Sequence, residues 1–323
     1  MMMRHIFLLL SFLSFGIMAT VAAADEKAPE VVPRVQMGAY LLRLSNVSQK
    51  DGTFEVDMWV WFRWKDKSLK PYESFEFANG KIESRSNPEV TEDEGYQYTS
   101  VRVQGTVFHQ FDVRRFPLDN HLLTIEFEDE NLDVSKFEYE VDQGVAMDPS
   151  LSVGGWTATL ARPSVARHIY PTSYGLRSSG DKASSYSRFI LPIKLERTSY
   201  SMLLKQFWIS FLAVVLGLLA LRVKATDLDA RFGLGVGSIF AASANAYTIS
   251  ESLPITTVIT LAEQLNFLAI GTIFFTVFLS IASLRLCYAG KDEAADRQDL
   301  LAFWVVGCMY LLANLWIVWK MVA

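Results

Sequence analysis

The sequence predicts an exported all-β domain followed by four membrane-crossing stretches. Three observations lead to this fold class: a short apolar segment at the start, period-two alternation over residues 25–198, and long uncharged stretches after Thr198. The 323 residues are 51% hydrophobic and 20% charged, which excludes a disordered chain and argues against an ordinary soluble enzyme. A formal charge of −5 argues against a nucleic-acid partner, because nucleic acids are usually bound by a basic face.

Residues 1–24 have the pattern of a secretory signal peptide. Arg4 and His5 form a positive start, residues 6–18 form an apolar core, and Ala22 to Ala24 end the segment with small residues. The core is too short to span a bilayer comfortably. We expect cleavage after Ala24; the alternative is an uncleaved anchor, and in either case the chain that follows is exported.

Residues 25–198 are charged, rich in turn residues and organised as short strands. Apolar side chains recur at every second position in three segments, which is typical of strands with one buried face. Turn signals such as Lys50-Asp51-Gly52 and Asn79-Gly80 separate such segments, so we expect an antiparallel β-sandwich. The alternating apolar residues are Phe54, Val56, Met58, Val60, Phe62 and Trp64; Leu123, Ile125 and Phe127; and Phe189, Leu191, Ile193 and Leu195.

Residues 199–323 are expected to form four transmembrane helices, at about 202–222, 231–251, 259–285 and 300–320. Four crossings after an exported N-terminus place the β-domain and the C-terminus outside the cell membrane. The two inward connections carry the positive charge that favours this orientation. Their basic residues are Arg222, Lys224, Arg231, Arg285, Lys291 and Arg297.

The second of these stretches is unusually polar for a membrane helix. One face, with members three or four residues apart, has a carboxylate at each end, small residues between and one bulky aromatic near the middle. Several copies of such a helix around a symmetry axis could enclose a pore, whereas a small-residue face also suits close packing of transmembrane helices. This face consists of Asp229, Gly233, Gly237, Phe240, Ala244, Tyr247 and Glu251.

The segment from Phe111 to His121, with the sequence FDVRRFPLDNH, resembles the loop that names the Cys-loop receptor superfamily, the pentameric ligand-gated ion channels. In animal members two cysteines bracket this loop; here His109 and Leu123 occupy those places, as in bacterial members that lack the disulfide. Arg197 and Leu253-Pro254-Ile255-Thr256 resemble the family's residues before the first helix and between the second and third helices.

The resemblance implies an immunoglobulin-like sandwich, a homo-pentamer in the inner membrane of a bacterium, and a central path lined by the second helices. Five Phe240 rings would form a hydrophobic constriction that closes by dewetting, and Asp229 and Glu251 at the two mouths would favour cations. Opening would be coupled to a ligand, an ion or pH acting on the periplasmic domain. The residues implied in this coupling are Asp112, Phe116, Pro117, Asp119, Arg197 and Pro254.

Other signals are weaker. Tyr170, Tyr174 and Tyr186 stand where the family's capping loop would lie, and they are the candidate ligand-binding residues. The histidines have no metal-ligand spacing and no nucleophile–base set stands out, so we expect no metal, no cofactor and no enzymatic activity. The alternative to a cation channel with membrane lipid and permeant cations as partners is a non-conducting membrane protein of the same fold, acting as a binding or scaffold module.

Overall fold

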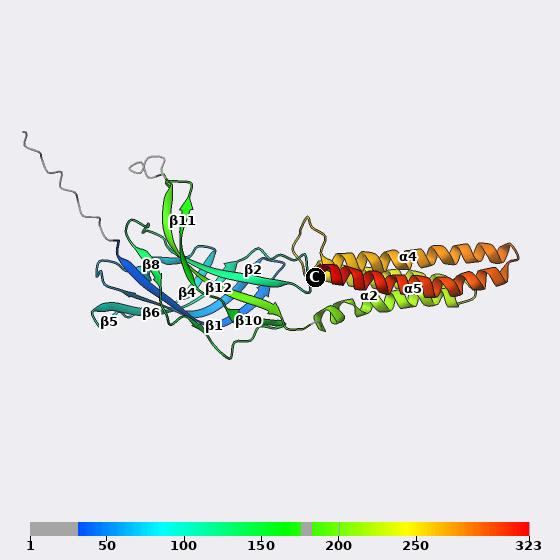
Figure 1. Ribbon diagram of the computed structural model, residues 1–323, viewed down its shortest axis with the longest axis horizontal. Coiled ribbons are helices and arrows are strands. Elements are labelled where there is room, and N and C mark those ends of the chain that lie inside the picture. The colour runs from blue at the N-terminus through cyan, green and yellow to red at the C-terminus, as the bar shows by residue number, and fades with distance from the viewer. Residues whose placement is uncertain (1–31, 176–182, 200, 323) are drawn as a thin grey trace, which may run out of the picture.

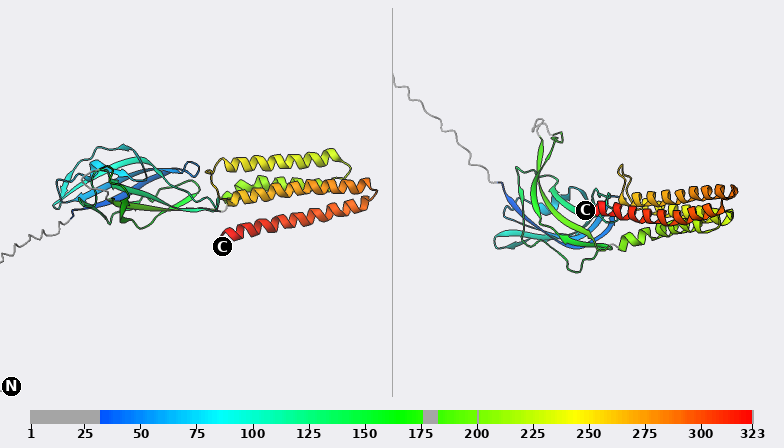
Figure 2. Two further views of the ribbon diagram at one scale, coloured as in Figure 1. Left: turned by 90° about the horizontal axis from the view of Figure 1, so that it is seen from above. Right: turned by 45° about the vertical axis from the view of Figure 1, so that its right-hand side comes forward.

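The computed structural model describes residues 32–175, 183–199 and 201–322, and the expected signal peptide lies outside these ranges. Figure 1 shows two parts joined end to end, a β-structured part from the first half of the chain and a bundle of long helices from the second. The C-terminal end lies near the junction between the two parts in all three views (Figures 1 and 2).

The first sheet has seven strands, and its main path runs β4-β6-β2-β1-β8, with β5 paired to β6 and β9 paired to β1. The long pairs β1–β2 and β2–β6 are antiparallel, whereas β8 and β9 run parallel to β1. The strands are β1 (Arg34–Ser48), β2 (Thr53–Trp64), β4 (Gly80–Arg85), β5 (Thr91–Asp93), β6 (Tyr96–Phe108), β8 (Glu138–Val141) and β9 (Ala146–Met147).

The second sheet has five strands, in the order β10-β12-β7-β3 with β11 paired to β12, and all its pairs are antiparallel. Its strands are β3 (Phe75–Phe77), β7 (Asn120–Asp129), β10 (Trp156–Leu160), β11 (Ser164–Tyr170) and β12 (Ser184–Arg197).

The core of the β-structured part lies between the two sheets. All the side chains for which the sequence predicts a buried alternating face are at most 3% exposed, so this prediction is confirmed. Burying one large apolar side chain contributes about 1.5–3 kcal/mol, which makes this layer the main source of the domain's stability.

The second half of the chain forms four long helices. Asp227 caps the start of α3 by accepting a hydrogen bond from the Ala230 amide, and Thr260 and Glu263 form a capping box at the start of α4. In the left view of Figure 2, α3 (yellow) and α5 (red) lie on opposite sides of α2 and α4. The helices are the short α1 (Pro71–Ser74) in the β-structured part, α2 (Ser201–Leu219), which continues as the 3-10 turn Ala220–Arg222, α3 (Leu228–Ser250), α4 (Leu261–Tyr288) and α5 (Asp292–Val322).

The predicted fold class, an all-β immunoglobulin-like sandwich followed by a four-helix transmembrane bundle, is wrong in two respects. The first sheet is mixed, because the chain after β7 returns beside β1 in the same direction and adds β8 and β9 as parallel edge strands. Among the described residues, three helices rather than four are long and apolar enough to cross a membrane: Ser201–Arg222, Leu261–Tyr288 and Asp292–Met321. The glycine, alanine and serine content of α3 leaves it without a stretch as apolar as those of the other three helices.

Candidate functional site

The Phe-Pro loop between β6 and β7 lies at the end of the β-structured part that meets the helices. Phe116 is 3% exposed and packs in the core, and Leu261 at the start of α4 donates its backbone N–H to the Arg114 carbonyl at 2.9 Å. Asp112 is exposed and pairs with Arg114 two residues later; the hydrogen bond from Arg114 lowers the pKa of Asp112 to about 2. The loop therefore touches the helices through its backbone, while Asp112 orders the loop itself.

A buried polar cluster of four side chains, Gln49, Asp119, His121 and Arg197, lies directly behind this loop. Arg197 Nε donates to Asp119 Oδ1 at 3.1 Å, and His121 Nε2 lies 2.5 Å from Asp119 Oδ2. Gln49 donates its amide to the same carboxylate, and its amide oxygen accepts from Arg197 Nη2 at 3.4 Å. The cluster ties the β1–β2 turn, the Phe-Pro loop and the end of β12 together.

The electrostatics of this cluster keep Asp119 ionised. Burial alone raises the pKa of the Asp119 carboxyl, but the hydrogen bond with His121 and the charge of Arg197 outweigh burial and leave the pKa below its ordinary value. The Arg197 guanidinium also stacks 3.7 Å from the centre of the Trp156 ring. Because Asp119 is 1% exposed, removal of Arg197 would leave a buried charge without its counter-ion.

Few polar contacts join the cluster's neighbourhood to the helices. Lys50 Nζ, in the β1–β2 turn, lies 2.9 Å from Glu251 Oε2 at the end of α3. Ile249 and Leu253, at and just beyond the end of α3, pack into the same apolar core as the sandwich. Pro254 lines an open cleft of about 770 Å³ between residues 254–258, the β1–β2 turn and residues 109–113. The predicted coupling residues thus lie on both sides of one junction.

The predicted polar face of α3 is exposed along its whole length. All seven of its members, from Asp229 to Glu251, are exposed in the single chain, with Phe240 at 72% and Tyr247 at 68%. The opposite face is buried against α2 and α4. Its members are Arg231, Gly235, Ser238, Ala242, Asn245 and Ile249.

Polar anchors that the sequence did not reveal hold this buried face. Asn245 donates to Ser210 Oγ on α2 at 2.9 Å, and Ser210 donates in turn to Asn266 Oδ1 on α4 at 3.1 Å. At the other end of α3, Arg231 pairs with Asp299 of α5, and Ser283 Oγ of α4 donates to the same carboxylate at 2.8 Å. Arg231, which the sequence places two residues from Asp229, is therefore neutralised inside the bundle.

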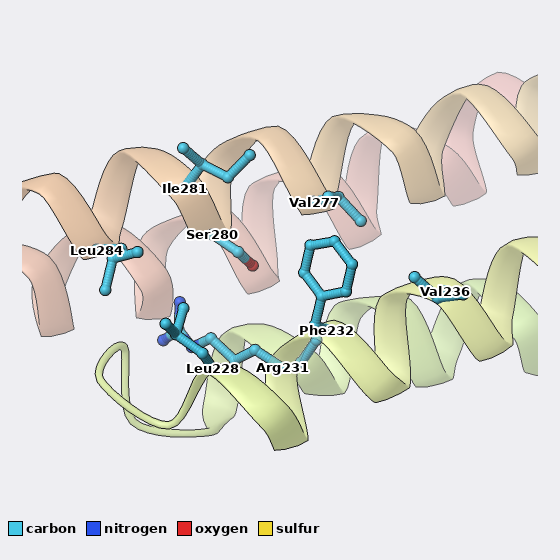
Figure 3. Close-up of a pocket in the computed structure, with 9 residues that line it drawn as sticks. Leu228, Arg231, Phe232, Val236, Val277, Ser280, Ile281 and Leu284 are labelled. Carbon is cyan, nitrogen blue, oxygen red and sulfur yellow. The ribbon is translucent and has the colours of Figure 1, made fainter.

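A small apolar pocket of about 40 Å³ lies between the start of α3 and α4 beside this ion pair. In Figure 3, Phe232 points from α3 towards Val277 of α4, and the Arg231 guanidinium lies beside Leu228. One turn further along α3 the two helices touch closely, because a Cβ added at Gly235 would lie 2.8 Å from Val277 of α4.

The three candidate ligand-binding tyrosines gather in space: Tyr170 ends β11, Tyr186 lies on β12 and Tyr174 lies in the turn after β11. The Tyr170 ring lies 5.9 Å from Tyr174 and 5.8 Å from Tyr186. Tyr170 donates to Glu128 at 2.9 Å and accepts from Arg188 at 2.9 Å; burial and the bond to Glu128 raise the pKa of Tyr170 to about 12. Residues 176–182, which follow Tyr174 in the sequence, lie outside the described residues.

No model of a known protein family matches the chain, and no curated protein matches its sequence.

The buried cluster predicts a strong coupling between Asp119 and Arg197. We expect Arg197→Ala and Asp119→Ala each to lower the free energy of unfolding by about 3–5 kcal/mol, and the double variant to lose much less than the sum. Chemical unfolding of the purified protein, followed by tryptophan fluorescence, measures this cycle. The exposed pair Lys70–Glu73 is the control, with effects of at most about 1 kcal/mol, and additive losses at Asp119 and Arg197 would contradict the pairing.

The lowered pKa of Asp119 predicts a specific acid sensitivity. A carboxyl with a depressed folded-state pKa contributes stability that is complete above its unfolded pKa of about 3.9 and is lost as the pH falls through the folded pKa. His121, Arg197 and Gln49 are the groups that face it. The fall in unfolding midpoint between neutral pH and about pH 3 should be smaller in Asp119→Asn than in the parent protein; an equal fall would rule out this carboxyl as a source of acid sensitivity.

Proposed function

We propose that this chain is the subunit of a pentameric, cation-selective ion channel of the Cys-loop receptor type, in which α3 lines the ion path. The observation that carries the proposal is the division of α3 into a buried face, anchored by Asn245 and Arg231, and an exposed face with a carboxylate at each end. Lipid would not solvate such a face, because charged and polar groups in hydrocarbon are costly unless they meet water or partners.

The position of α3 in the bundle supports an axis on its exposed side. α3 and α5 lie on opposite sides of α2 and α4, and the outer side of α5 is apolar, with Trp304, Leu312 and Trp316 all more than half exposed. An apolar outer side suits lipid contact, and copies arranged with α5 outwards would bring their α3 faces together around water. The number five comes from the resemblance of the Phe-Pro loop, Arg197 and residues 253–256 to the pentameric family.

In this arrangement Phe240, Asp229 and the Asp119 cluster each have a proposed role. Phe240 is the bulky apolar group near the middle of the face, and a ring of five would form the dry constriction. Asp229 forms no ion pair among the described residues, so its charge is available at the inner mouth. The Asp119 cluster would make the β1–β2 turn, the Phe-Pro loop and β12 move together. A ligand, an ion or a proton that acts on the β-structured part could then shift this unit against residues 254–258.

The proposed location is the inner membrane, with the β-structured part and the C-terminus in the periplasm. The three apolar helices indicate a membrane protein. The C-terminal end lies near the β-structured part (Figure 1), which supports a common side for both. The connection after α2 and the one between α4 and α5 lie at the far end of the bundle and carry the basic residues that favour the cytoplasm.

One observation favours the alternative of a non-conducting binding or scaffold protein. An added Cβ at Gly233 or Gly237 would meet nothing within 4 Å, so this face of α3 is open to close approach by another helix. Small-residue faces promote such packing in membranes. In that case Phe240 would pack between helices instead of closing a path.

Replacing the constriction tests the proposal. Phe240→Ser should admit water at the narrowest point and give a current without any stimulus in planar-bilayer recordings, from protein that native mass spectrometry shows to be a pentamer. Phe274→Ser on α4 is the matched control, since Phe274 is 69% exposed but not on α3, and it should stay silent. A silent Phe240→Ser pentamer that is folded and inserted would favour the non-conducting alternative.

The inner carboxylate predicts the selectivity of this open background. In a salt gradient, Asp229→Ala combined with Phe240→Ser should move the reversal potential towards that of chloride, because the five carboxylates no longer concentrate cations at the mouth. Asp229→Glu should keep the cation preference, and Glu293→Ala, an exposed acid at the start of α5, should leave it unchanged. A reversal potential that does not move would remove Asp229 from the ion path.

A further inference from the structure

The contact between Lys50 and Glu251 is the one ion pair that joins the β-structured part to the helices among the described residues. The two residues lie 201 positions apart in the sequence, on the β1–β2 turn and at the end of α3, and their charged atoms are 2.9 Å apart. The hydrogen bond to Glu251 raises the pKa of Lys50, so the ammonium keeps its charge at neutral pH. The β1–β2 turn thus places a positive charge beside Glu251, the last residue of the exposed face of α3.

This pairing makes the two ends of the α3 face different. At the inner end, the neighbouring cation Arg231 is held by Asp299, and Asp229 remains free of ion pairs in the part of the chain that the structure describes. At the outer end, Glu251 is compensated by Lys50. The next acid along, Asp51, accepts a hydrogen bond from Ser48 at 2.6 Å and remains exposed beside Lys50.

Both partners remain in contact with solvent. The Lys50 and Glu251 side chains are 51% and 55% exposed, so they contribute little to stability, and their fields reach the water beside them. In salt of about 0.01 M such charges act over about 30 Å, and in about 1 M over about 3 Å. Their effect on passing ions must therefore depend strongly on ionic strength.

We propose that Lys50 sets the charge of the outer mouth by neutralising Glu251, and that it is a specificity-determining residue of the ion path, an inference that rests on the proposed channel function. With Lys50 in place, the pair contributes no net charge to the rim, which keeps only the charge of Asp51, while Asp229 carries the charge at the inner mouth. Without Lys50, each subunit presents Glu251 and Asp51 together, and monovalent cations accumulate at the outer mouth.

Single-channel recordings in the Phe240→Ser background test the proposal at low and high salt. Charge compensation predicts opposite signs: at low salt Lys50→Gln should raise the sodium conductance about two-fold, Glu251→Gln should lower it by a similar factor, and the double variant should return to the parent value. At about 1 M salt the conductances of the parent, the two single variants and the double variant should be equal, because the charges are screened. Lys70→Gln is the matched control, because Lys70 forms a pair with Glu73 at 3.1 Å with exposures of 60% and 54%, and it should change nothing.

The outcomes separate the two proposals. If the background conducts and the Lys50 and Glu251 variants shift the conductance in the same direction, the pair is only a structural contact and Lys50 does not set the charge of the mouth. Conductances equal to the parent value in both single variants would overturn the proposal equally. A background without any current would reject the channel function itself, and with it the role of Lys50.

Discussion

The proposed channel depends on one constraint, which is that the exposed face of α3, with a carboxylate at each end and mostly small residues between, faces water and not lipid. The buried face of α3 is fixed by polar contacts with its neighbours. Asn245 donates a hydrogen bond to Ser210 of α2, which in turn donates to Asn266 of α4, and Arg231 forms an ion pair with Asp299 of α5. Polar anchors of this kind are strong where water is scarce, because a broken pair leaves buried groups unsatisfied. The exposed face is therefore held in one orientation, and in the proposed channel it faces water and the same face of the other copies.

The junction between the β-structured part and the helices is held by a small number of polar contacts. The Asp119 carboxylate contacts Arg197, His121 and Gln49. These contacts join the β1–β2 turn, the Phe-Pro loop and the end of β12 into one unit. The contacts across the boundary include the hydrogen bond from the Leu261 amide to the Arg114 carbonyl, the Lys50–Glu251 pair, and apolar contacts of Ile249, Leu253 and Ala262. In the proposed channel, a shift of the β-structured part would act on α3 through this ion pair and through the apolar side chains that share the sandwich core.

The spacing of residues in the sequence predicted the features that depend on local spacing, namely the buried and exposed faces of strands and helices. Period-two alternation identified the buried faces of β2, β7 and β12, and three- or four-residue spacing identified the face of α3 that is exposed. The parallel edge strands were missed, because β8 and β9 are short and their partner β1 lies about a hundred residues earlier. The anchors Asn245 and Asp299 and the partner of Glu251 were missed for the same reason: their contacts are long-range, and nothing beside them in the sequence marks them. The fourth crossing was predicted because residues 232–250 are long enough and uncharged, although they are unusually polar, and the helix they form is not apolar enough to count as a membrane span.

The central claim, that the exposed face of α3 lines water within the membrane, is tested most directly by cysteine accessibility along that helix. In a background lacking Cys287 and Cys308, single cysteines would be placed on the exposed face at 233, 237, 240 and 244 and on the buried face at 235, 238 and 242. A charged thiol reagent applied to both sides of proteoliposomes should modify the first set rapidly and the second set slowly, with the three- or four-residue spacing of the helix face. Equal protection of both sets would show that α3 is packed against protein or lipid all round, and would contradict the account.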